Sequence, residues 1–248
     1  DHRQGQGTWI TFFQENNNAK GNEYVEQLKS SSNFPIYAAS IAKVCLKNKQ
    51  FAEALPIVEL GYNQAAAAFL SSDPAVKKSN IAGRYISLAP LYATALAASN
   101  QPEKSTQILE EFFTNYSYGK NSAENIILLA TNDLKLGKDL DAFTVLNDFL
   151  IQQSVDPEVV NTIKPLYEKL NNQKGNFKGY LAKVKTQANN ALIAKYKSEM
   201  IKKEAPNFSL VNMKGETVSL ADMKGKVIVL DLWATWCGYS IEFNKTMN

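Results

Sequence analysis

The sequence predicts a mainly α-helical protein whose C-terminal end changes to a short α/β segment. Three observations lead to this prediction. Helix-start and helix-end signals recur along residues 1–203, and small and large apolar residues return there at fixed spacings. The helical pattern then stops at Lys202–Pro206, after which short β-type runs follow. We therefore predict two domains, a helical domain over 1–203 and a second domain over 204–248.

Composition narrows the class of protein. The 248 residues are 45% hydrophobic and 21% charged, which is ordinary for a globular chain. The net charge is +3, and no block of Lys and Arg interleaved with aromatic residues is present, so we expect no nucleic-acid partner. No apolar run reaches the length of a membrane span. The sequence begins at Asp1 rather than Met, so we expect any secretion signal or lipid anchor to lie outside it.

Helix boundaries are marked by capping residues and prolines. Predicted helix starts are Asn33-Phe34-Pro35, Asp73-Pro74, Asn100-Gln101-Pro102, Ser122 and Asp156-Pro157. Gly119, Gly137 and Gly175 suit helix ends. Pro56, Pro90 and Pro165 fall inside helical patterns, where we predict kinks or boundaries.

An internal repeat appears when the predicted helix pairs are aligned. Ala42, Ala93 and Ala130 lie on successive first helices; Ala54, Ser105 and Ala142 follow twelve residues later; Val58, Leu109 and Leu146 come four residues after those. Small residues let two helices approach closely, and the larger ones fill the groove one turn on. The pattern resembles the tetratricopeptide (TPR) helix-turn-helix unit, although the intervals are 51 and 37 residues. The resemblance implies a TPR-like α-hairpin array with a surface for a protein partner.

The ends of this array are also predicted. Trp9–Phe13 and Glu23–Leu28 would cap one end, and segments 157–173 and 178–203 would continue it toward the second domain.

The pattern of the C-terminal segment predicts strands followed by the start of a helix. Phe208–Val211 and Glu216–Leu220 flank a turn and predict a β-hairpin. Val227–Leu232 is apolar and β-branched, which predicts a buried strand of the parallel type. A helix should begin at Gly238–Ile241, so Cys237 would stand at the positive end of a helix dipole, which favours the thiolate.

The string Trp233-Ala234-Thr235-Trp236-Cys237-Gly238 closely resembles the active-site signature of thioredoxin-like thiol–disulfide oxidoreductases. Ala205–Leu210 and Val218–Lys226 look like the lead-in of the TlpA/ResA-like extracytoplasmic branch. The resemblance implies that 204–248 is the N-terminal portion of a thioredoxin-like α/β domain. It also implies a protein thiol or disulfide as substrate, no cofactor, and a periplasmic or otherwise extracytoplasmic bacterial location.

The resemblance assigns roles to individual residues. Cys237 would be the nucleophile, and Trp236 and Gly238 belong to its surroundings. Ser240 stands where the resolving cysteine is usual, so a mixed disulfide on Cys237 could form but could not be closed by this site. The substitution is either an engineered trap or a natural monothiol or degenerate site.

Two more site residues are Asp231 and Tyr239. By the resemblance, Asp231 matches a buried acid that helps move the proton of the resolving thiol; the alternative is a polar residue at a strand end, satisfied by local bonds. Tyr239 replaces proline at the helix start. Trp233 is expected in the core. Cys45 falls on an interior helical face and is expected to be inert, with a disulfide to Cys237 as the alternative. The single histidine, His2, and the lack of a Cys/His cluster argue against a metal site.

These observations support two main functions. The first is an extracytoplasmic thiol–disulfide oxidoreductase with a helical accessory domain, inactive or substrate-trapping in this chain because of Ser240 and the incomplete domain. The second is a TPR-like protein–protein interaction module with a degenerate thioredoxin tail. A third reading makes the tail a cap on the helical array. The sequence leaves the oligomeric state open.

Overall fold

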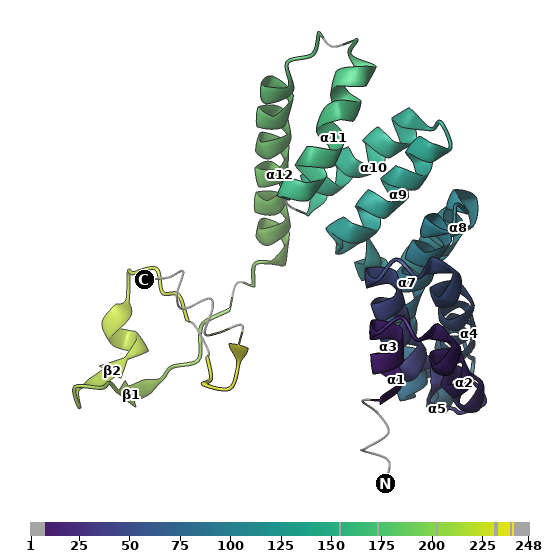
Figure 1. Ribbon diagram of the computed structural model, residues 1–248. Helices are drawn as coiled ribbons and strands as arrows, with labels where there is room; N and C mark the ends of the chain where they lie inside the picture. Colours follow the sequence, from purple (N-terminus) through teal and green to yellow (C-terminus); the bar gives the residue numbers. More distant parts are fainter. Residues whose placement is uncertain are drawn as a thin grey trace. The chain divides into compact units, whose positions relative to one another are not determined.

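A computed structural model of the chain describes residues 8–153, 155–172, 174–201, 203–230, 233–238 and 240 (Figure 1). The chain divides into two compact units, Asp1–Ser198 and Glu199–Asn248. The described part of the first unit is helical, and the second contains a small two-stranded sheet. The prediction of a mainly α-helical chain with a short β-containing segment after it is confirmed.

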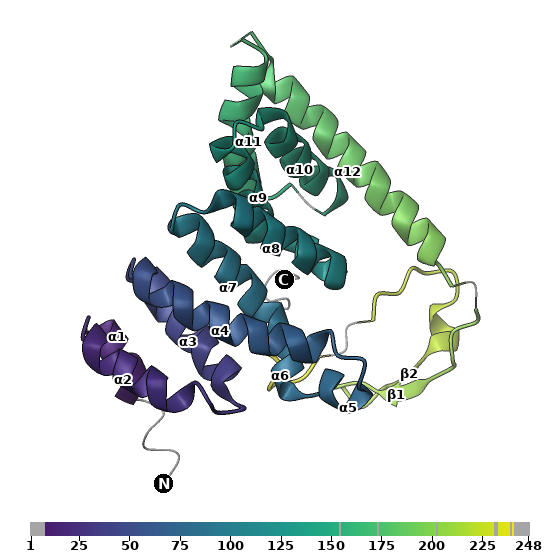
Figure 2. The same cartoon turned by 90° about the vertical axis from the view of Figure 1, so that its right-hand side faces the viewer.

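The helices of the first unit are α1 Thr8–Gln14, α2 Asn18–Leu28, α3 Phe34–Lys47, α4 Phe51–Phe69, α5 Pro74–Lys77, α6 Asn80–Gly83, α7 Tyr85–Ala98, α8 Pro102–Asn115, the 3₁₀ helix η1 Ser117–Asn121, α9 Ala123–Lys135, α10 Asp139–Gln152, α11 Pro157–Leu170 and α12 Phe177–Glu199. Within the hairpins α3 packs with α4, α7 with α8 and α9 with α10, and between two hairpins α4 packs as extensively with α7. Figure 2 shows these hairpins following one another along the unit.

The same turn closes four of these hairpins. One residue between the two helices adopts a left-handed conformation: Asn16 (φ 58°), Lys49 (φ 60°), Asn100 (φ 60°) and Gly137 (φ 75°). The next residue donates its backbone N–H to the carbonyl five residues earlier, for example Gln50 to Cys45 at 2.8 Å and Gln101 to Leu96 at 2.9 Å. This bond satisfies a carbonyl that the helix end leaves free.

The turn sets the register of each hairpin. Five residues after the left-handed position come Gly21, Ala54, Ser105 and Ala142, and nine residues after it come Val25, Val58, Leu109 and Leu146, all of them buried. The repeat therefore begins one hairpin earlier than the sequence analysis placed it, since α1 and α2 follow the same rule. Gly21 and Val25 have the same four-residue spacing as Ala54 and Val58, so the sequence already contained this earlier repeat.

The interval of 51 residues between the second and third hairpins, from Ala42 to Ala93, has a structural reason. α4 is 19 residues long, and the short helices α5 and α6 lie between it and α7. α4 also approaches α3 very closely, because a Cβ on Gly61 would lie 2.5 Å from the Cβ of Ala38. Glycine leaves room for the long helix to pass.

Most predicted helix starts are confirmed. The side chains of Asp73, Ser122 and Asp156 accept hydrogen bonds from backbone N–H groups of the first turn. At Asn33 and Gln101 the side chain makes no such bond, and proline in the first turn marks the start instead.

Pro56, Pro90 and Pro165 each lie inside a helix, so none of them marks a helix boundary, and the kinks predicted as the alternative stay a prediction. The buried residues on both sides of each proline hold the helix together despite the missing N–H.

A buried polar network ties the third hairpin to the fourth. The hydroxyl of Ser105 donates to the carbonyl of Ala93 at 2.7 Å and accepts from the Asn132 side-chain amide at 2.8 Å. Ser105 and Asn132 are fully buried, and the Asn132 side-chain oxygen has no hydrogen-bond partner. A buried amide with an open acceptor is costly, so its remaining bond to Ser105 matters.

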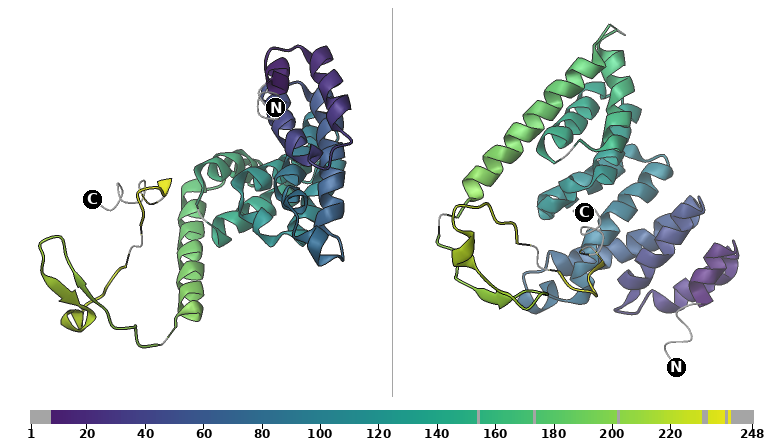
Figure 3. Two further views of the ribbon diagram at one scale, coloured as in Figure 1. Left: turned by 90° about the horizontal axis from the view of Figure 1, so that it is seen from below. Right: turned by 90° about the vertical axis from the view of Figure 1, so that its left-hand side faces the viewer.

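α12 differs from the other helices. Near its start, Tyr180 stacks on Tyr167 of α11, and its hydroxyl donates to the Asn147 side chain at 2.9 Å. Val184 is its one buried residue among those described, and residues 189–199 are exposed. Figure 3 shows α12 running past the end of α11, as its 23 residues against 14 require.

The second unit is built on a short hairpin. Strands β1 (Ser209–Val211) and β2 (Thr217–Ser219) pair antiparallel, with Leu210 opposite Val218. Gly215 takes a positive φ of 83° in the turn, as the predicted hairpin requires. The 3₁₀ helix η2 (Leu220–Met223) follows, capped by reciprocal bonds between Ser219 and Asp222.

The left-handed turn gives a first prediction. Gly137→Ala is expected to lower the free energy of unfolding by about 1 kcal/mol, because alanine disfavours a positive φ. No heavy atom lies within 4 Å of the added Cβ, so a steric clash contributes nothing. Gly83→Ala in α6 is the matched control, since it has equal space and an ordinary helical backbone. Urea unfolding followed by circular dichroism measures both; equal effects would contradict the argument.

The buried network gives a second prediction. Ser105→Ala is expected to destabilise the helical unit by about 1–3 kcal/mol, because the Asn132 amide loses its partner. The double variant Ser105→Ala with Asn132→Leu should recover part of this loss, since both polar groups are then removed. If the double variant loses more unfolding free energy than the two single variants together, the network is not the cause.

Candidate functional site

The described residues 227–230, which lead to the predicted nucleophile, do not form a strand. Val227, Ile228, Val229 and Leu230 carry no β pairing, and Val227 and Val229 are 97% and 76% exposed. The prediction of a buried strand is therefore wrong for these four residues, and Asp231 and Leu232 lie outside the described part. Strand formation needs a neighbouring strand, and among the described residues β1 and β2 pair only with each other.

Cys237 lies where the predicted helix starts. Its backbone N–H donates to the carbonyl of Ala234 at 3.0 Å, which closes a turn directly before it. Gly238 and Ser240 have helical backbone, in agreement with the predicted helix start. The Cys237 side chain is half-buried and forms no disulfide. A thiol at this position combines partial access with the first N–H groups of a helical turn, which favour negative charge.

The two tryptophans beside Cys237 are both accessible. Trp236 is 86% exposed, which leaves its indole free to meet another polypeptide. Trp233 is 58% exposed, so the prediction that it belongs to the core is wrong. No described layer of the second unit covers it.

The structure brings Cys237, Gly238 and Ser240 together in one turn, as their sequence spacing requires. Ser240 is half-buried. Asp231 and Tyr239, the two other residues assigned by resemblance, lie outside the described residues, and their roles stay predictions.

Cys45 behaves as the sequence suggests. It is fully buried in α3 and forms no disulfide, so the alternative bond to Cys237 is not made. Burial raises the pKa of the Cys45 thiol to about 12, and the negative charge of Glu53 adds to this rise. The thiol is neutral at physiological pH and acts as a small apolar side chain.

The described residues contain neither a metal-binding cluster nor a helix fit to span a membrane. No group of three or more His, Cys, Asp and Glu side chains there is placed to hold a metal ion. None of the helices in the described ranges is long and apolar enough to cross a membrane.

Comparison with known proteins finds similarity in the second unit. Residues 201–247 match the AhpC/TSA family. The thiol-disulfide oxidoreductase ResA of Bacillus anthracis is 49% identical over 37 residues, which cover 15% of this chain and 21% of ResA. The thioredoxin-like protein YneN of Bacillus subtilis strain 168 is 56% identical over 34 residues, or 14% of this chain and 20% of YneN.

A longer match is to ResA of Bacillus subtilis strain 168, at 42% identity over 48 residues, which cover 19% of this chain and 27% of that protein. The chain thus spans about a fifth to a quarter of the length of these relatives. No solved structure matches the chain. The matches support a thioredoxin-like segment of the thiol–disulfide oxidoreductase kind at the C-terminal end.

The contrast between the two cysteines gives a third prediction. In the folded chain at pH 8, iodoacetamide is expected to modify Cys237 and to leave Cys45 unmodified, because Cys45 is buried and protonated. Mass spectrometry of peptides after timed quenching gives both rates. Labelling in urea is the control, since unfolding should make Cys45 reactive. Equal rates in the native chain would contradict the assignment of Cys45 to the core.

Proposed function

We propose that the protein is a thiol–disulfide oxidoreductase of the thioredoxin-like class, which acts on protein disulfides through Cys237. The observation that carries the proposal is the position of Cys237, a half-buried thiol at a helix start beside an exposed tryptophan. The match of the surrounding residues 201–247 to the AhpC/TSA family supports it. In this proposal residues 204–248 belong to a thioredoxin-like domain that this chain contains in part, and residues 1–203 form the TPR-like accessory domain.

The chemistry follows from the thiolate. The Cys237 thiolate attacks one sulfur of a substrate disulfide, and a new sulfur–sulfur bond forms as the substrate bond breaks. The second substrate sulfur leaves as a thiolate and takes up a proton. Trp236 would lie against the incoming polypeptide, and Asp231 would serve the proton transfer that the resemblance assigns to it.

Ser240 stops the reaction at this point. A hydroxyl is far too weak an acid to supply the anion that would attack the mixed disulfide. The substrate therefore stays covalently attached until an external thiol releases it. We propose that this chain traps substrates rather than turning them over, and that the intact protein acts outside the cytoplasm, as the TlpA/ResA-like resemblance implies.

The alternative is a binding protein whose thioredoxin-like tail is degenerate. Ser240 favours it, and so does the size of the helical unit, which holds most of the chain. Such a protein would bind partners through its helical hairpins and would not need Cys237. An enzyme of this class needs the strands and helices of a whole thioredoxin-like domain, so a test of activity uses the complete protein.

The two functions differ in a fourth prediction. The complete protein is expected to form a stable mixed disulfide between Cys237 and disulfide-bonded insulin. Dithiothreitol should reverse this bond. Ser240→Cys should convert this trapping into catalytic insulin reduction with dithiothreitol as the electron donor, because the introduced thiol can release the bound chain. Turbidity of reduced insulin follows the reaction.

Cys237→Ala in the Ser240→Cys background is the matched control and should be inactive. The pKa of Cys237, measured from the pH dependence of its alkylation, should lie below the ordinary ~8.5. An inactive Ser240→Cys variant of the complete protein, with an ordinary Cys237 pKa, would favour the binding function.

A further inference from the structure

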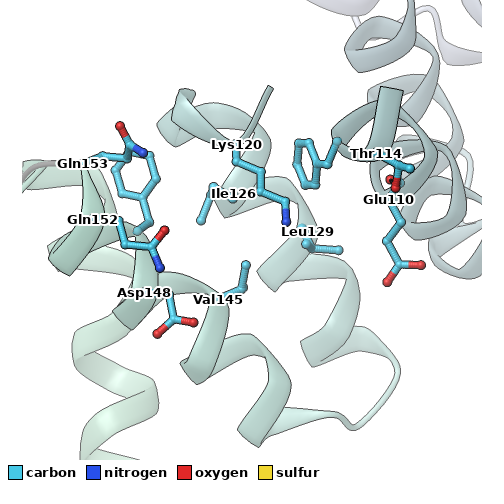
Figure 4. A pocket seen from close by; sticks show the side chains of 11 residues that line it. Glu110, Thr114, Lys120, Ile126, Leu129, Val145, Asp148, Gln152 and Gln153 are labelled. Carbon is cyan, nitrogen blue, oxygen red and sulfur yellow. Dashed lines mark hydrogen bonds between the residues drawn. The ribbon is translucent and has the colours of Figure 1, made fainter. Parts of the chain in front are cut away.

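A groove of about 420 Å³ lies between helices α8, α9 and α10 of the helical unit (Figure 4). Its floor is apolar and includes Ile126, Leu129 and Val145. The carboxylates of Glu110 on α8 and Asp148 on α10 stand on opposite sides, with Leu129 and Val145 between them. The groove therefore combines an apolar floor with negative charge on two walls.

The repeat shows that this arrangement is unusual within the chain itself. Glutamates occupy the same position in three successive second helices, immediately after Val25, Val58 and Leu109. Glu26 forms an ion pair with Lys29. Glu59 accepts a hydrogen bond from the Tyr92 hydroxyl at 2.7 Å. Two of these three carboxylates are thus satisfied by the chain.

Glu110 is the exception. Its carboxylate makes no hydrogen bond or ion pair with another described residue. The position that holds Lys29 in the first hairpin holds Phe113 here, so an aromatic ring replaces the neutralising ammonium. Across the groove, Asp148 accepts one long bond from Asn147 at 3.4 Å and has no ion pair among the described residues.

The equivalent groove between α2 and α4 makes a useful comparison. It is lined by Glu26 and Ile57 at the positions that Glu110 and Val145 occupy in the α8–α10 groove. Its glutamates are already engaged, Glu26 by Lys29 and Glu53 by the Asn18 amide at 2.9 Å. Two grooves with the same arrangement of helices therefore differ in their carboxylates. Those of the α2–α4 groove are engaged by the chain itself, and those of the α8–α10 groove can bind another molecule.

The α8–α10 groove already attracts a cation. The Lys120 ammonium lies 6.0 Å from the centre of the Phe113 ring, at the outer limit of a cation–π contact. Lys120 is exposed and reaches the groove from η1, so it can swing away. Its position shows that the groove has room for a cation beside the Phe113 ring.

We propose that the α8–α10 groove binds a segment of a protein partner that carries a lysine or arginine next to large apolar side chains. The cationic group lies between Glu110 and Asp148 and near the face of Phe113, and the apolar side chains cover Ile126, Leu129 and Val145. Charge complementarity selects this occupant, because an acidic segment would face two carboxylates. All residues of the groove belong to the helical unit, so the proposal does not rest on the redox chemistry of Cys237.

The fifth prediction tests the groove with random dodecapeptides displayed on phage and selected on the full chain. The enriched peptides are expected to pair Lys or Arg with Leu, Ile, Phe or Trp. A synthetic copy of the most enriched peptide should bind Glu110→Gln/Asp148→Asn about tenfold more weakly than the parent chain in calorimetry, since two charge contacts are lost. Its affinity should also fall with added salt.

Two matched variants separate a specific groove from general charge. Glu26→Gln removes one negative charge from the equivalent α2–α4 groove and should leave binding unchanged. Lys120→Gln should strengthen binding severalfold, whereas Lys104→Gln, an equal change of charge at an exposed α8 position outside the groove, should not.

Three results would overturn the proposal. Selection could enrich no peptide, or only peptides without Lys or Arg. The selected peptide could bind the Glu110→Gln/Asp148→Asn variant as tightly as the parent chain. Finally, Glu26→Gln could weaken binding as much as the double variant does, which would indicate attraction to the whole surface.

Discussion

The helical unit depends on the close approach of paired helices across a very short turn. A left-handed residue reverses the chain, and the next N–H closes onto a carbonyl five residues back. The small residue five positions on, such as Ala54 or Ala142, is then fully buried against the first helix. A larger side chain at that point would push the pair apart and open the core, so one local geometry sets the register of every hairpin that uses it.

The second unit lacks a comparable constraint. Among its described residues the sheet has two strands of three residues each, and Val227, Val229 and Leu230, which follow, are largely exposed. An isolated hairpin buries too little apolar surface to offset the entropy of ordering the chain. The thiol at Cys237 is therefore placed by a local turn and helix start rather than by a packed core. A thioredoxin-like domain would need further strands beside Val227–Leu230 to give the site a rigid support.

Local signals in the sequence predicted local structure well. Ser122 and Asp156 cap helices because the bond runs to N–H groups two or three residues away, and the turn around Cys237 likewise depends on adjacent residues. Lys49 gave no such signal, because lysine does not favour the left-handed conformation and the hairpin imposes its positive φ. The strand predicted at Val227–Leu232 is not formed over its described residues, Val227–Leu230, because strand pairing depends on partners that a local pattern cannot supply.

The α8–α10 groove shows why surface function is the hardest part to predict. Glu110, Leu129 and Asp148 come from three helices, and their grouping appears only after two hairpins have packed together. Alignment of the repeats nevertheless shows how the two grooves differ in sequence, because Phe113 in one hairpin occupies the position of Lys29 in another. In a helical repeat the buried contacts between helices can stay the same while the exposed groove residues change. Such changes can alter which segment the groove binds without destabilising the core. If that segment belongs to a disulfide-bearing substrate, binding it on the same chain as Cys237 raises its effective concentration at the thiol, and the weak contacts of one groove can then direct a covalent reaction.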